Sequence, residues 1–229
     1  MTRYDVFHVA HIVVFAVWFG TDLATFQLSR KVLDRTLEVS TRRVIATAML
    51  GIEILARLCL PAMLALGLSL SIEGGSLDIA TSWLIVVWAV TAGWVGLVWT
   101  IHLQSHRGTG GELAGHLALI DLAVRSVVCL AVWVGGVWSL IADDGPFAGR
   151  WLGAKVTLFA LIMTCGIAIR FALKPFSAAF GRLVADGSSP EREDAMALAI
   201  RRAQPLVGII WVCLVSATIV GVLQRLPWE

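Results

Sequence analysis

Six long apolar runs, separated by short polar segments, form the main pattern of this chain. A helix that crosses a lipid bilayer needs about 20 mainly apolar residues, and each run is long enough to do so. The sequence therefore predicts an all-α, polytopic integral membrane protein, a bundle of six transmembrane helices in one membrane domain, 1–229. The predicted spans are residues 6–26, 44–72, 81–103, 114–142, 151–173 and 205–226.

The basic residues between these runs lie almost entirely on alternate segments. Segments 27–43, 104–113 and 174–204 together carry eleven lysines and arginines, whereas segments 73–80 and 143–150 carry one. Lysine and arginine concentrate in cytoplasmic loops of membrane proteins. We therefore expect both termini to lie outside the cytoplasm.

The longest polar segment, 174–204, contains an amphipathic stretch from Ser188 to Arg202. Serines precede Pro190, acidic residues follow it, and arginines come at the end of the stretch, which is the usual order of charges along a helix. We expect a cytoplasmic loop whose amphipathic helix starts near Pro190, lies on the membrane surface and leads into the last span at Pro205.

Composition agrees with a membrane protein in contact with the lipid bilayer. The chain is 58% hydrophobic and 15% charged, with a mean hydropathy of +0.83, whereas soluble domains carry roughly 25% charged residues. The net charge of +2 gives no reason to expect nucleic acid as a partner. The four cysteines lie in apolar runs without CxxC spacing, so we expect buried thiols.

Two of the predicted spans contain an acid followed four residues later by an arginine, Glu53 with Arg57 and Asp121 with Arg125. This spacing places each pair on one helix face, so the charges can neutralise each other in place. A charge at the bilayer centre costs roughly 2.5–3.5 kcal/mol even on mild scales, so these groups should face the bundle interior. The two pairs lie at similar depths and can meet in one polar cluster.

Three interpretations of these pairs remain open. They can form a structural ion-pair lock between the second and fourth spans. Alternatively, Arg57 and Arg125 hold carboxylates of a ligand such as haem propionates. In a third interpretation Glu53 and Asp121 act catalytically, as a proton relay.

His8 and His11 share one face of the first predicted span. An imidazole in hydrocarbon needs a hydrogen-bond partner, a metal or a haem iron, and His11 lies about one turn deeper than His8. Lys155 lies near the outer end of the fifth span. It can extend to the membrane surface, or it can face the same cavity as the two histidines.

Three further histidines, His102, His106 and His116, lie near the predicted cytoplasmic side. His102 and His106 share a helix face, and with His116 across a short loop they have the ligand chemistry for zinc, copper or haem. Interfacial histidines without a ligand are the alternative.

The third span also carries small residues four apart, Ala89 with Gly93 and Ala92 with Gly96. Such residues let another helix approach closely. We expect this face to be a helix contact.

Short motifs in this chain resemble a known family. His11, Trp18 seven residues later, and the following Phe19-Gly20 are similar to the first helix of the HemJ-type membrane protoporphyrinogen IX oxidases and the related CopD-like proteins. Trp151-Leu-Gly-Ala-Lys155 is similar to the Trp-Leu-x-x-Lys opening of a later helix in that family. The resemblance implies a helical protein that binds haem b, with His11 as a ligand of the haem iron and Lys155 near the active pocket.

These observations lead to three expectations about function. The first is a haem-binding membrane oxidoreductase or electron-transfer protein, with His11 or His8 as axial ligand. The second is a proton- or metal-coupled transporter that uses the buried acid and arginine cluster. The third is a non-catalytic subunit of a larger membrane complex. In each case we expect an integral protein of a bacterial inner membrane, either with other membrane subunits or as a homo-oligomer.

Overall fold

The computed structural model describes residues 1–107, 111–224 and 226, without the side chains of 105–107. Within these residues the chain is all-helical and has no strand, as the sequence predicts. The seven helices are α1 (Arg3–Val32), α2 (Val39–Glu73), α3 (Trp83–Arg107), α4 (Glu112–Ile141), α5 (Arg150–Ala172), α6 (Lys174–Asp186) and α7 (Pro190–Leu223).

Six stretches in the described part of the chain are long and apolar enough to cross a membrane, which confirms the predicted number of spans. Most boundaries differ from the prediction by a few residues. The helix that contains the last predicted span, 205–226, is longer at its start and shorter at its end than the prediction. The helix begins at Pro190, and it ends at Leu223 because Gln224 takes a left-handed conformation with φ 50°.

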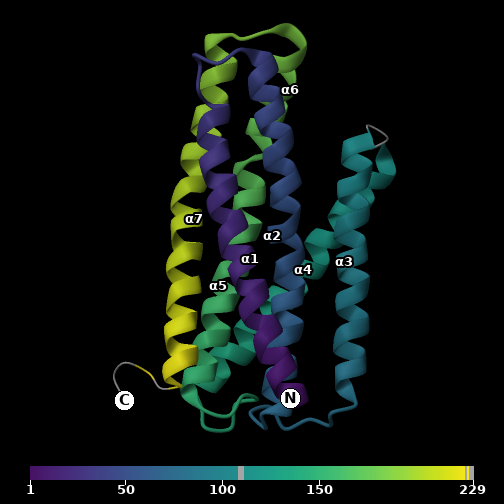
Figure 1. Ribbon diagram of the computed structural model, residues 1–229, viewed down its shortest axis with the longest axis vertical. Coiled ribbons are helices and arrows are strands. Elements are labelled where there is room, and N and C mark those ends of the chain that lie inside the picture. The colour runs from purple at the N-terminus through teal and green to yellow at the C-terminus, as the bar shows by residue number, and fades with distance from the viewer. Residues whose placement is uncertain (108–110, 225, 227–229) are drawn as a thin grey trace.

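Helices α1, α2, α3, α5 and α7 run roughly along one axis (Figure 1). In the figure α1, α2, α5 and α7 lie close together and α3 stands at one edge of the bundle, while α4 starts beside α3 and crosses obliquely behind the other helices. Helix α1 begins, and α7 ends, at the same end of the bundle, here called the terminal end. The opposite end, which holds the α1–α2 connection and α6, is here called the basic end, since Arg30 and Lys31 lie in the last turn of α1.

The main core lies between α1, α2, α4, α5 and α7, and Trp94 and Val98 of α3 also belong to it. Trp18 of α1 is buried and meets Phe159 of α5 edge to face, with ring centroids 6.1 Å apart. All four cysteines are buried and free, as expected, and all belong to this core. A second cluster at the basic end joins α2, α6 and α7 to the end of α1, and it includes Val32, Phe176, Leu183 and Met196.

Two glycines bring α4 and α5 into backbone contact. A Cβ on Gly136 would lie 2.8 Å from the Thr157 nitrogen, and a Cβ on Gly153 would lie 2.7 Å from the Leu140 nitrogen. Any larger residue at either position would therefore force the two helices apart. Small residues of this kind are the usual means of close helix packing in membranes.

The small-residue face of α3 does not make the contact that the sequence predicts. A Cβ on Gly93 or Gly96 would meet no atom within 4 Å in the described chain. Instead, two tryptophans connect α3 to its neighbours: the indole of Trp88 donates to Ser69 Oγ at 3.1 Å, and that of Trp94 donates to Asp121 at 3.1 Å. Indole hydrogen bonds, rather than close backbone packing, hold α3.

The segment 174–204 is not a loop with one surface helix. Residues Lys174–Asp186 form α6, and α7 starts at Pro190 with Ser189 as its N-cap, at the predicted position, but then continues without a break through Pro205. Its first half is not a surface helix because Met196, Ala199 and Ile200 are buried in the second core cluster. The burial of this apolar face explains why the segment joins the bundle.

A buried ion pair holds the basic end together. The guanidinium of Arg42 on α2 donates to both carboxylate oxygens of Glu193 on α7, at 2.6 and 2.9 Å, and its Nε donates to the Val32 carbonyl at 2.7 Å. Ser188 donates a further hydrogen bond to Glu193 at 2.7 Å. The two side chains are only 1% and 4% exposed, so the pair links α1, α2 and α7 away from solvent.

Arg42→Ala should strongly destabilise the protein, because it leaves the Glu193 carboxylate buried without a partner. The expected loss in the free energy of unfolding is about 3–5 kcal/mol. Arg35→Ala is the control, since Arg35 pairs with Asp194 on the surface, and such a pair contributes about 1 kcal/mol or less. The measurement is the thermal midpoint of the detergent-purified protein. Equal decreases in the two variants would contradict a structural role for the buried pair.

Candidate functional site

Asp121 on α4 is the best-connected charged side chain within the spans. It is 5% exposed. It accepts hydrogen bonds from Arg125 Nε at 3.0 Å, from Arg170 Nη1 at 2.9 Å and from the Trp94 indole at 3.1 Å. One carboxylate therefore joins α3, α4 and α5.

Arg170 was not singled out from the sequence. It lies near the end of an apolar run, four residues before Lys174, where a basic residue is typical of a membrane boundary. In the structure its Nη2 donates to the Ala118 carbonyl at 2.9 Å while Nη1 binds Asp121. Only the packing of α5 against α4 shows that it is an ion-pair partner.

The pair on α2 forms as the spacing predicts. Arg57 donates to Glu53 Oε1 from Nε at 3.1 Å and from Nη2 at 2.7 Å. This pair is far less buried than the pair on α4, since the Arg57 side chain is 49% exposed and that of Glu53 is 28% exposed. Arg57 also lies within electrostatic range of Asp121, so the charges of α2 and α4 are neighbours.

Arg125 uses only part of its hydrogen-bonding capacity. Its Nε donates to both oxygens of Asp121, and its guanidinium carbon lies 5.4 Å from the ring centroid of Trp94. The described residues offer no hydrogen-bond partner to its two terminal nitrogens. We call Glu53, Arg57, Asp121, Arg125 and Arg170 together the charged layer.

Asp22 on α1 lies beside the charged layer, within electrostatic range of Glu53. It is partly buried, and it forms no hydrogen bond or ion pair with the described residues. The sequence did not mark Asp22 as a site residue because no basic residue lies three or four positions away on α1. Its neighbour is a second acid on another helix.

His11 lies on α1, nearer the terminal end of the bundle, on the side of the helix toward α2 and α5. Its Nδ1 is buried and has no hydrogen-bond partner among the described residues. Its Cε1 would lie 3.9 Å from a Cβ on Gly67, so a glycine of α2 faces the imidazole. His8 is exposed and packs on Tyr4, with ring centroids 5.8 Å apart.

Lys155 on α5 is the charged neighbour of His11. Its chain runs across Gly221 of α7, where a Cβ would lie 2.8 Å from Nζ. No hydrogen bond from Lys155 to the described residues is formed. Lys155 on α5 and His11 on α1 lie within electrostatic range of each other, with Gly221 of α7 beside the lysine and Gly67 of α2 beside the histidine.

His11 and the arginines belong to different levels of the bundle. Gly67, beside His11, lies ten residues from Arg57 on α2, which corresponds to about 15 Å along the helix axis. The candidate iron ligand and the candidate propionate partners predicted from the sequence are therefore about three helical turns apart along α2.

The described residues contain no group of three histidine, cysteine or acidic side chains placed to hold a metal ion. His116 is exposed, and His102 lies beside Trp99 with ring centroids 5.9 Å apart. The side chain of His106 lies outside the described residues. The predicted three-histidine site thus has no geometric support in the part that is described.

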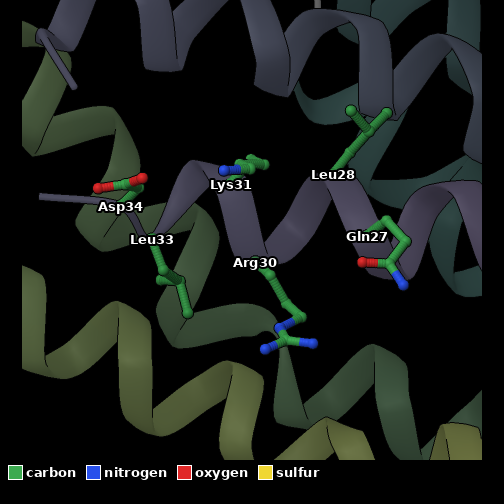
Figure 2. A pocket seen from close by; sticks show the side chains of 6 residues that line it. All are labelled: Gln27, Leu28, Arg30, Lys31, Leu33 and Asp34. Carbon is green, nitrogen blue, oxygen red and sulfur yellow. The ribbon is translucent and has the colours of Figure 1, made fainter. Parts of the chain in front are cut away.

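A hollow of about 560 Å³ lies at the basic end of α1. Figure 2 shows that its side chains leave the chain in different directions. Hydrogen bonds from the Thr36 hydroxyl and backbone lower the pKa of the Asp34 carboxyl below its usual range. Because its polar groups do not converge, the hollow is a surface feature. Its lining residues are Gln27, Leu28, Arg30, Lys31, Leu33 and Asp34.

Asp121→Asn should destabilise the bundle more than Glu53→Gln, because it leaves both Arg125 and Arg170 without an anionic partner. We expect a loss of about 3–5 kcal/mol for Asp121→Asn and about 1 kcal/mol for Glu53→Gln, whose partner is half-exposed. Trp94→Phe, which removes only the indole donor, should cost about 1 kcal/mol. Thermal midpoints in detergent test the order, and equal decreases for the two acids would refute it.

Comparisons with known proteins leave the family of this chain open. A scan against protein-family models, a search of curated proteins and a search of solved structures each return no match. The residues and contacts above, with the resemblance in short motifs, are therefore the basis for assigning a function.

Proposed function

We propose that this protein is a haem-binding membrane oxidoreductase or electron-transfer protein, in which His11 is an axial ligand of the iron and Lys155 binds a haem carboxylate. The observation that carries the proposal is the buried Nδ1 of His11, which has no hydrogen-bond partner in the described chain. Lys155 lies within electrostatic range of this imidazole. An imidazole buried in a membrane span without a hydrogen-bond partner has a high free-energy cost. Such a histidine is therefore a candidate functional residue.

The donors around His11 fit haem b by their chemistry. Histidine is the common axial ligand of b-type haem, and a lysine ammonium can pair with a propionate. Gly67 and Gly221 leave room for the His11 ring and the Lys155 chain, which pack next to the backbone of α2 and α7. His8, which is exposed on the outside of α1, is the weaker of the two candidate ligands.

Bound haem would supply one-electron redox chemistry at its iron. The residues of this chain would set its conditions. His11 would fix the axial position, and Lys155 would neutralise a carboxylate at the terminal end. Trp18, seven residues along the same helix and 4% exposed, would close the site toward the charged layer and exclude water.

His11→Ala should abolish stoichiometric haem binding, whereas His8→Ala should retain it. Lys155→Met should weaken haem binding by about tenfold, since a charge-assisted contact contributes about 1.5–3 kcal/mol. The measurement is an absorption spectrum of the detergent-purified protein, oxidised and dithionite-reduced, with pyridine haemochrome quantitation. A colourless wild-type protein, or an unchanged spectrum in His11→Ala, would refute the proposal.

A second candidate function, proton-coupled transport, is supported by Asp22. This side chain carries a carboxyl group within a span, has no basic partner among the described residues and faces Glu53. Unpaired intramembrane acids are typical of proton relays in transporters. In this interpretation Asp22 would take up and release the proton, while Arg57 would hold Glu53 in place.

Asp22→Asn should reduce proton flux by at least tenfold if transport is the function, because an amide cannot carry the proton. Flux is measured in proteoliposomes with an internal pH dye and an imposed potassium diffusion potential. Asp78→Asn, the same change at an exposed position between α2 and α3, is the matched control. Equal flux in Asp22→Asn and wild type would eliminate this candidate.

A further inference from the structure

We propose that Arg57, Arg125 and Arg170 form a binding site for an oxyanion, the phosphate or carboxylate headgroup of an amphiphile that reaches the charged layer from the bilayer. The site is separate from His11 and does not depend on haem binding.

The first observation is the local charge. Three guanidiniums of the charged layer pair with only two carboxylates, Glu53 and Asp121. Asp22 lies within electrostatic range of Glu53, but it bonds to none of the three arginines. An anion bound by the arginines would complete the pairing that a membrane interior requires.

The second observation is the set of unused donors. Arg125 binds Asp121 through Nε alone, and Arg57 binds Glu53 through Nε and Nη2. The terminal nitrogens of Arg125 and Nη1 of Arg57 have no hydrogen-bond partner in the described chain. The planar fork of an arginine matches the oxygens of phosphate and carboxylate, so these donors define the class of ligand.

The third observation is the exposure of Arg57 in mid-helix. Its side chain is 49% exposed, yet it lies eighteen residues after the start of α2 and sixteen before its end. An arginine near a helix end reaches the membrane surface at little cost, but this position is too far from both ends. An anionic group bound to the guanidinium would neutralise its charge, and this would lower the free-energy cost of exposing it to lipid.

The surroundings indicate that the ligand carries an apolar part. Leu50 on α2 lies seven residues before Arg57, on the same face of the helix, and is 44% exposed. Helix α3 stands at the edge of the bundle and presents Gly93 and Gly96, where a Cβ would meet no atom within 4 Å (Figure 1). A headgroup on the arginines with acyl chains along these apolar surfaces satisfies both kinds of contact.

The test uses the full chain in dodecyl maltoside, an uncharged detergent, and measures the thermal midpoint during titration with three probes. These are dihexanoyl-phosphatidylglycerol, dihexanoyl-phosphatidylcholine and inorganic phosphate. We expect a saturable rise with phosphatidylglycerol, and no rise with the zwitterionic lipid. A rise with inorganic phosphate equal to that with phosphatidylglycerol would assign the site to a free anion instead of a lipid.

Two substitutions in one ion pair should shift the apparent affinity in opposite directions. Arg57→Gln should weaken phosphatidylglycerol binding by about tenfold or more, because it removes a charged donor. Glu53→Gln should strengthen it, because it frees the Arg57 guanidinium from its internal partner. Arg43→Gln, at an exposed position on the same helix, controls for general attraction of anions and should leave binding unchanged.

A purely structural pair would respond differently, since both substitutions would lower the midpoint without changing the lipid-dependent shift. That result would overturn the proposal, as would the absence of a shift with any anionic probe. Equal weakening by Arg57→Gln and Arg43→Gln would also overturn it, because binding would then reflect surface charge alone.

Discussion

An ionised side chain inside a bilayer must be neutralised where it lies, and Asp121 shows how this chain meets that constraint. Its carboxylate accepts from Arg125, Arg170 and Trp94, so one buried group fixes three helices relative to one another. Removing the carboxylate would leave two arginines without their anionic partner in a medium that solvates charge poorly. The positions of α3 and α5 around α4 are therefore coupled to one charge.

The two candidate sites lie at different levels along the axis of the bundle. His11 and Lys155 lie toward the terminal end, and the charged layer lies about 15 Å away along α2. Trp18 and the rest of the apolar core lie between them. The proposed cofactor site at His11 and the proposed anion site at the arginines therefore each need their own test.

The sequence predicts the parts of this arrangement that depend on local spacing. The six spans follow from apolar run length, the two acid–arginine pairs follow from four-residue spacing, and the start of a helix at Pro190 follows from its cap. Contacts between helices were not predictable in this way. Arg170 and Trp94 meet Asp121 only through packing, and the exposed glycines of α3 resemble a contact face although no helix covers them.

The two ends of the bundle differ in how firmly they are held, and this difference bears on how a ligand reaches the charged layer. At the basic end, Arg42 and Glu193 form a bidentate, fully buried pair that joins α2 to α7. Helix α3 is attached by two indole hydrogen bonds, from Trp88 and Trp94, and by the burial of Trp94 and Val98 in the main core. The Trp94 indole donates to Asp121 and also lies against Arg125. A ligand that approached Arg125 from the side of α3 would therefore have to displace this indole.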